Sequence, residues 1–201
     1  MYHLPATTAI KKQLPKKAIY AKFDLKAAQR EAFDAEVSRL DLVAVVSPQT
    51  IPAISAGEEI SEVYVMLVTL RERDYSKNSV LLLHKLIKQN IIFALQFEGE
   101  TQLAVYHTGQ LLHTDWQSTL ETEIPIEGLT MDAVWEGMVK AIGGIEVEEG
   151  CTLGEQIVQY NAQAELKAKI DALEHRMYKE RQPRKRKELF DELKKLKHGL
   201  A

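Results

Sequence analysis

Short apolar runs rich in β-branched residues recur along the chain and predict strands. Two of these runs lie at 42–46 and 63–70, and their composition is typical of strands. The runs at 91–97 and 102–107 are separated by a short turn that contains a glycine, so they predict a β-hairpin. A further strand is expected at 111–116.

Other segments show helical periodicity. Phe33, Val37 and Leu40 recur at i, i+4 and i+7, which predicts a helix over 24–39. Two more helices are expected, each beginning at a Ser or Thr that can cap its first turn, over 76–89 and 130–144. In contrast, residues 1–22 contain two Leu-Pro pairs. We expect them to be extended rather than helical, because proline fixes φ and has no N–H donor.

Together these elements predict an α+β fold. Residues 40–116 are expected to form a mostly antiparallel sheet with the helix at 76–89 packed on one face, because the strands are separated by short turns rather than by regular β-α-β alternation. Residues 145–154 are acidic and contain glycine, which favours a linker. We therefore expect a body over 1–150 and a basic helical arm over 151–201.

The arm carries two apolar seams at heptad spacing. Apolar residues step by four, three and four in each half, and Pro183 lies between the halves, where it should break the helix. A helical hairpin with its tip at 182–183 and a kinked helix laid on the body or on a partner both satisfy this pattern. Each half is too short to be stable alone, so its seam needs the other half, a second subunit or a foreign protein. The seam residues are Leu166, Ile170, Leu173, Met177, Leu189, Leu193, Leu196 and Leu200.

Charge is divided unevenly between the body and the arm. Residues 151–201 hold 12 Lys and Arg against 8 Asp and Glu, a balance of +4, and residues 1–150 hold 14 against 21, a balance of −7. Cations crowd around Pro183, and we expect them to bind nucleic-acid phosphates or an acidic protein surface. The alternative is a solvated helical face supported by intrahelical Glu–Lys pairs. These cations are Lys179, Arg181, Arg184, Lys185, Arg186 and Lys187.

Composition narrows the class of protein. The chain has 201 residues, of which 45% are hydrophobic, so it can bury a sizeable core. No apolar run approaches the roughly 18 residues that span a bilayer, and no apolar signal segment is recognised at the N-terminus. Cys151 is the only cysteine, which excludes an intramolecular disulfide and a cysteine-based zinc cluster. We therefore expect a cytoplasmic protein that does not associate with membranes.

No catalytic centre, metal site or cofactor is predicted. Glu58, Glu59 and Glu62 precede a predicted strand, and Glu98 lies in the predicted hairpin turn. A divergent metal-dependent nuclease, or another nucleic-acid enzyme, that uses these carboxylates is the alternative function. However, the chain lacks the acidic-x-Lys strand that we expect of such a nuclease, and it has no glycine-rich phosphate loop.

Two polar groups lie at the end of the predicted hairpin or just after it. His107, His113 and Asp115 have no further ligand at a spacing that suits a metal, so we interpret them as a polar hairpin surface. In the sequence Thr114-Asp115-Trp116, the tryptophan could stack on a base while the aspartate accepts a base amino group. The structural interpretation is a tryptophan that anchors the core and an aspartate that caps a turn.

An ordered set of short motifs covers nearly the whole chain. It comprises Leu4-Pro5, Leu14-Pro15-Lys16-Lys17 with Tyr20, Ser47-Pro48-Gln49-Thr50-Ile51, Glu59-Ile60-Ser61-Glu62-Val63, Thr114-Asp115-Trp116, Ile126-Glu127-Gly128-Leu129 and Gln182-Pro183-Arg184-Lys185. Through these motifs the chain resembles the bacterial domain-of-unknown-function family 4391. The resemblance implies a gene beside DNA methyltransferases and helicases of restriction-like or phage-defence loci, and it carries over no catalytic residue. We therefore expect a non-enzymatic accessory or adaptor protein that docks to partner proteins, to a second copy of itself or to DNA through its arm.

Overall fold

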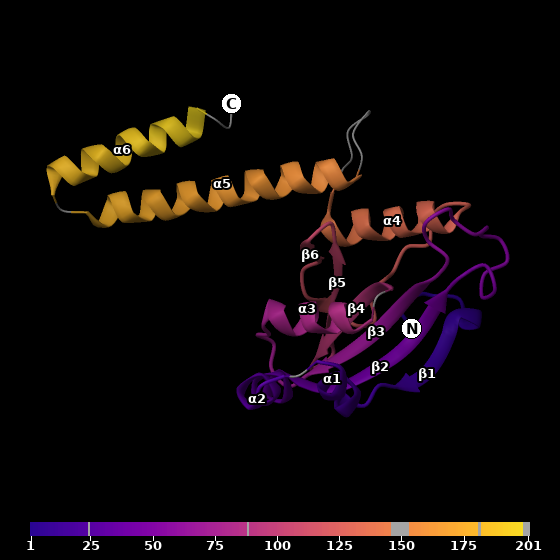
Figure 1. Cartoon of the computed structure of the whole chain (residues 1–201). Coiled ribbons are helices and arrows are strands. Elements are labelled where there is room, and N and C mark those ends of the chain that lie inside the picture. Colours follow the sequence, from indigo (N-terminus) through magenta and orange to yellow (C-terminus); the bar gives the residue numbers. More distant parts are fainter. Residues whose placement is uncertain (24, 88, 146–152, 181, 199–201) are drawn as a thin grey trace. The chain divides into compact units, whose positions relative to one another are not determined.

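Among the residues described, seven strands form one mixed sheet (Figure 1). The computed structural model describes residues 1–23, 25–87, 89–145, 153–180 and 182–198. The chain divides into two compact units, Met1–Glu146 and Val147–Ala201. The first unit holds the described part of the body, including the sheet, and the second holds the described part of the arm.

From β1 to β6, strands that are neighbours in the sheet are also neighbours in the chain. The order is β1-β2-β3-β4-β5-β6, and β7 pairs with β5. The pair β3–β4 is parallel and is connected by helix α3 (Lys77–Leu86), whereas the other pairs are antiparallel. The predicted α+β fold with a mostly antiparallel sheet is confirmed. The strands are β1 (Ala9–Gln13), β2 (Val37–Val46), β3 (Val63–Leu70), β4 (Asn90–Phe97), β5 (Glu100–His107), β6 (Gln110–His113) and β7 (Gln117–Ser118).

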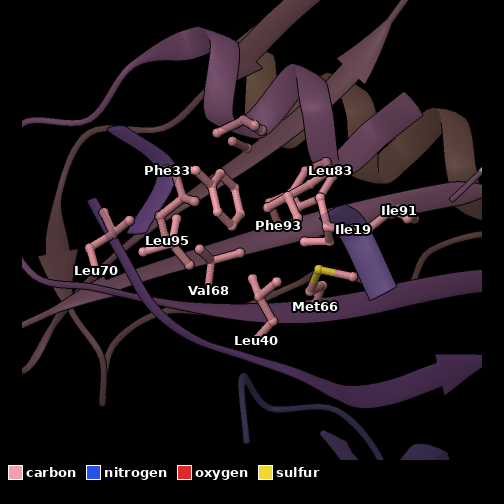
Figure 2. Close-up of a cluster of buried hydrophobic side chains, with 13 residues drawn as sticks. Ile19, Phe33, Leu40, Met66, Val68, Leu70, Leu83, Ile91, Phe93 and Leu95 are labelled. Atoms are coloured by element: carbon pink, nitrogen blue, oxygen red, sulfur yellow. The ribbon is translucent and has the colours of Figure 1, made fainter. Parts of the chain in front are cut away.

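Three helices, α1 (Lys16–Lys22), α2 (Ala27–Glu36) and α3, pack on one face of the sheet. Figure 2 shows Ile19, Phe33 and Leu83 of these helices gathered with apolar side chains of β2, β3 and β4. Burial of one such side chain contributes roughly 1.5–3 kcal/mol, so this cluster holds the helices on the sheet. Its members from the sheet include Leu40, Met66, Val68, Leu70, Ile91, Phe93 and Leu95.

Helix α4 (Met131–Gly143) packs on the opposite face, where it contacts β5 and β6. Successive side chains in a strand point to opposite faces, so Val65, Ile92 and Leu103 point away from α1, α2 and α3, and all three are buried. An apolar stripe of this helix is also buried. Its members are Trp135, Met138, Val139 and Ile142.

The ends of α3 and α4 follow their sequence signals. The side chain of Ser76 accepts the N–H of Asn78 at 3.2 Å, and that of Thr130 accepts the N–H of Ala133 at 3.2 Å. Each bond satisfies an N–H group of a first turn that has no partner inside its helix. At the other end of α4, Gly144 adopts φ of 59°, which is the left-handed conformation that commonly ends a helix.

The helix predicted over 24–39 is wrong at its C-terminal end. α2 ends at Glu36, and both Val37 and Leu40 lie in β2. The pairing of β2 with β3 shifts register between Val37 and Arg39. This bulge inserts an extra residue into β2, so two residues that are three apart face the same side, and both are 1% exposed. The helix-like spacing therefore comes from a bulged strand.

The prediction that residues 1–22 are extended is also wrong in part. A short 3-10 helix (Ala6–Thr8) precedes β1, and α1 follows it. Pro15 is the N-cap of α1. A proline can begin a helix, because the N–H groups of the first turn have no partner within the helix. Ile19 of α1 is fully buried, and its burial favours the helix at this place.

Two further segments differ from the sequence prediction. The strand expected at 111–116 is shorter, because β6 ends at His113. The N–H of Thr114 still donates to the carbonyl of Leu103 at 2.9 Å. However, the hydroxyl of Thr114 accepts the N–H of Leu103 at 3.1 Å and donates to the carbonyl of Asp115 at 2.9 Å, so a side chain takes over one bond of the strand ladder here. Most of the linker predicted at 145–154 falls on residues 146–152, which lie outside the described residues.

Candidate functional site

The arm forms a hairpin of two packed helices, α5 (Leu153–Lys179) and α6 (Pro183–His198). α6 begins at Pro183, as expected of a residue that lacks an N–H donor but suits the first turn of a helix. Figure 1 shows α6 running back alongside α5. Of the two arrangements compatible with the sequence, a helical hairpin and a kinked helix, the structure therefore adopts the hairpin.

Three seam residues are buried in the arm, in which α5 packs against α6. Ile170, Leu173 and Leu193 are 6%, 9% and 6% exposed, respectively. Glu174 Oε1 accepts from Lys197 Nζ at 2.7 Å, and this ion pair joins α5 to α6. Leu200 lies outside the described residues. The seam thus folds the arm on itself, and its remaining members are only partly exposed, namely Leu166, Met177, Leu189 and Leu196.

The predicted cations gather at the tip of the hairpin, where α5 ends and α6 begins. Lys179 is the last residue of α5, and Arg184, Lys185, Arg186 and Lys187 follow Pro183 directly in α6. Between the helices, Glu180 Oε1 accepts the N–H of Gln182 at 2.9 Å. Arg181 lies outside the described residues. We call the exposed cations of this region the basic tip, and they are Lys179, Arg184, Lys185, Arg186 and Lys187.

Two aromatic side chains flank the basic tip. Tyr178 is 73% exposed and Phe190 is 54% exposed. Sequence reasoning missed them, because it considered only the residues that form the seams. A signal was present, since each aromatic residue directly follows a seam residue, Met177 or Leu189, and so lies outside the seam.

The Thr114-Asp115-Trp116 segment belongs to the body. Trp116 is half-buried against the core cluster, and the guanidinium carbon of Arg73 lies 5.5 Å from the centre of its ring. Asp115 is exposed, whereas the hydroxyl of Thr114 is bonded to the backbone. One ring contact of Trp116 is thus made by a cation of the same chain, and the structure does not bring the three side chains together around a common site.

Three histidines of the body, His84, His107 and His113, pack against aromatic rings or bond to neighbouring groups. The ring centroids of His84 and Tyr106 are 4.4 Å apart, and those of His107 and Trp135 are 6.1 Å apart. Burial lowers the pKa of His84, with a further contribution from the adjacent Lys85, and burial also lowers the pKa of His107. In the described part of the chain, His, Cys, Asp and Glu residues do not gather in groups of three or more that could hold a metal ion.

The loop before β3 binds a carboxylate with its backbone. Asp132, at the start of α4, accepts the N–H groups of Glu58 at 2.6 Å, Glu59 at 3.3 Å and Ile60 at 2.8 Å. These N–H groups hold the pKa of Asp132 below its usual range, that of Ile60 most strongly. Sequence reasoning missed Asp132. An aspartate in the first turn of a predicted helix was the available signal.

The other carboxylates weighed as metal ligands have local partners or lie apart. Glu62 Oε1 accepts from the hydroxyl of Tyr64 at 2.5 Å. In the hairpin turn, Glu98 has φ of 44°, and the nearby Glu100, which is not among the carboxylates of the alternative function, forms an ion pair with Arg73 at 3.3 Å. The structure therefore does not bring these carboxylates together at one strand end.

Within the described residues, no helix is both long and apolar enough to cross a bilayer. No curated protein is significantly similar to the chain. No solved structure matches it either. A family model with the description "Domain of unknown function (DUF4391)" matches residues 3–200. This match covers nearly all of the sequence and agrees with the ordered motifs, so the chain belongs to the DUF4391 family.

Proposed function

We propose that the protein is a non-enzymatic accessory or adaptor protein of a nucleic-acid-processing system of the restriction-like or phage-defence kind. In this role it docks to DNA or to a partner protein through the basic tip. The observation that carries the proposal is the concentration of exposed cations at one end of a folded hairpin.

The position of these cations in α6 supports a role in binding. The N-terminus of a helix carries a partial positive charge, so acidic residues stabilise the first turn and basic residues oppose it. In α6 the residues after Pro183 are four cations, and the first turn holds no acidic residue. Helix stability does not account for this arrangement. An anion that binds at the basic tip would offset the unfavourable charge.

Nucleic-acid phosphate is the anion that best suits this site. Each cation that neutralises a phosphate releases a condensed counterion, so several neighbouring cations give strong, salt-dependent affinity. An acidic protein surface is the other possible ligand. The body itself carries a balance of −7 over residues 1–150, so a second copy of the chain offers such a surface. The partly exposed edges of the seam, Leu166 and Leu196 among them, support docking of a further helical chain.

Charge reversal tests the proposal. Fluorescence anisotropy with labelled DNA at several salt concentrations would compare the parent with the triple variant Arg184→Glu, Lys185→Glu, Arg186→Glu. We expect weaker binding to duplex DNA and a flatter salt dependence, by about 0.9 in slope for each phosphate that the variant no longer neutralises. The matched control reverses three exposed cations elsewhere in the hairpin, Lys169, Lys194 and Lys195.

The outcomes separate the two kinds of partner. If the tip variant binds DNA as the parent does, the basic tip is only a solvated surface. If the parent does not bind DNA at low salt, the nucleic-acid half of the proposal fails. Light scattering then decides the protein half, since docking to a second copy requires a dimer that the tip variant loses and the control variant keeps.

A further inference from the structure

The exposed aromatic side chains are confined to the arm. Within the described residues, the large hydrophobic side chains that remain exposed are Met1, Leu120, Leu129, Val158, Tyr178 and Phe190. Only Tyr178 and Phe190 are aromatic, and both flank the basic tip. Because an aromatic ring has a large apolar surface, its exposure favours an interaction site over a purely structural role.

The helical geometry places these two rings on one side of the hairpin. Tyr178 directly follows the seam residue Met177, and Phe190 directly follows the seam residue Leu189. Each residue is turned about 100° from the one before it in a helix. α5 and α6 run in opposite directions, so a step away from the seam leads to the same side of the hairpin in both helices.

The basic tip lies next to both rings. Tyr178 precedes Lys179, and Phe190 is one helical turn from Arg186 and Lys187, so these residues share a side of α6. One side of the tip therefore combines two exposed ring faces with several positive charges.

From this juxtaposition we infer that the basic tip binds single-stranded nucleic acid, with its bases stacked on Tyr178 and Phe190 and its phosphates held by the neighbouring cations. The inference rests on the proposed function and names the form of nucleic acid that the tip selects. Aromatic rings and cations on one surface are the combination by which proteins hold single strands without reading their sequence.

The rings favour a single strand over a duplex. In a duplex the base faces are covered by neighbouring base pairs, so an exposed ring gains little from lying beside the sugar-phosphate backbone. Unpaired bases present free faces, and each stacking contact lowers the dissociation constant by about tenfold. The cations attract either form, whereas the rings discriminate between them.

Substitutions that keep the apolar character but remove the ring test this inference. The full chain carrying Tyr178→Leu and Phe190→Leu would be compared with the parent by fluorescence anisotropy on labelled oligothymidylate and on a duplex of equal length. We expect each substitution to weaken binding to the single strand about tenfold and to change binding to the duplex by less than about twofold. The matched control is Tyr178→Phe with Phe190→Tyr, which keeps both rings and should bind as the parent does. Circular dichroism confirms that α5 and α6 stay folded, since leucine is a better helix former than either aromatic residue.

Each outcome bears on a different part of the argument. The inference is supported if the parent binds the single strand more strongly than the duplex, and if this preference is lost in the leucine variants and kept in the control. An oligouridylate probe then shows whether RNA is bound equally well. If the leucine variants bind the single strand as the parent does, the stacking role is overturned while the proposed function stands. If the parent binds neither form of nucleic acid, both the inference and the nucleic-acid half of the proposed function fail.

Discussion

A β-carbon on Gly57 would lie 2.3 Å from Oδ1 of Asp132, which is closer than any ordinary contact. The Asp132 carboxylate cannot move aside freely, because it accepts N–H groups of the loop at 58–60. We therefore expect Gly57→Ala to lower the midpoint of thermal unfolding, since the added methyl group displaces the carboxylate from these donors.

Two comparisons control this prediction. A β-carbon on Gly137, inside α4, would meet nothing closer than the carbonyl oxygen of Glu127 at 3.6 Å. Gly137→Ala should therefore stabilise the protein by up to about 1 kcal/mol through helix propensity. In an Asp132→Ala background, Gly57→Ala should lower the midpoint of thermal unfolding much less than it does in the parent. An equal cost in both backgrounds would show that the clash with Asp132 is not the cause.

The two half-buried histidines predict a loss of stability in mild acid. Burial lowers the pKa of His84 and of His107, so each binds a proton more weakly in the folded chain than in the unfolded chain. The stability that the two neutral histidines contribute to the folded chain is fully present above the usual histidine pKa of about 6.5, and it is lost as the pH falls below that value. Urea unfolding would give the free energy of unfolding at a pH near 7.5 and near 5.5. The decrease between these two pH values should be smaller for the variant His84→Gln, His107→Gln than for the parent. Equal differences would contradict the prediction.

Breaking the seam should unfold the arm. Leu173 is buried, whereas the adjacent Ala172 is exposed. Because burial of a leucine is worth roughly 1.5–3 kcal/mol, Leu173→Asp should reduce helicity and open the many basic cleavage sites of the arm to trypsin. Ala172→Asp places the same side chain one residue away and should leave the digestion rate near that of the parent. Comparable digestion of both variants would mean that the seam does not hold α5 and α6 together.

We expect no metal-dependent cleavage of DNA by the purified protein. The carboxylates considered for a nuclease do not converge. Glu58 and Glu59 contribute backbone N–H groups to Asp132, and Glu62 accepts from Tyr64. Incubation with DNA and magnesium or manganese should leave the substrate intact. Reproducible cleavage that disappears on Glu62→Gln or Glu98→Gln would instead support the alternative function, a metal-dependent nuclease.

Local signals allowed much of the fold to be predicted from the sequence. The β4–β5 hairpin follows from its turn, in which Gly99 adopts φ of 86°, and the caps of α3 and α4 follow from Ser76 and Thr130. Pairing between segments that are distant in the sequence could not be predicted in this way. The parallel pairing of β3 with β4 depends on how α3 packs, and the bulge near Val37 depends on the partner strand, so neither can be read from local periodicity.

The candidate site shows the same division. The cations of the basic tip are close in sequence, and Pro183 between them marks the turn of the hairpin. The contact of Gly57 with Asp132 joins two distant segments, and no local pattern predicts it. Tyr178 and Phe190 are adjacent in sequence to seam residues, yet the heptad pattern predicts only which residues are buried. It does not predict which exposed residues take part in binding.

The strand order has a consequence for how the chain acquires its structure. From β1 to β6, each strand pairs with the one that precedes it in the chain, so most of the sheet is built from contacts of modest sequence separation, which favours rapid folding. During synthesis, each strand can join the growing edge soon after it leaves the ribosome. One late contact is the hydrogen bond from the N–H of Ile124 to the carbonyl of Tyr2 at 3.2 Å, so the first residues to emerge are among the last to be fixed in place.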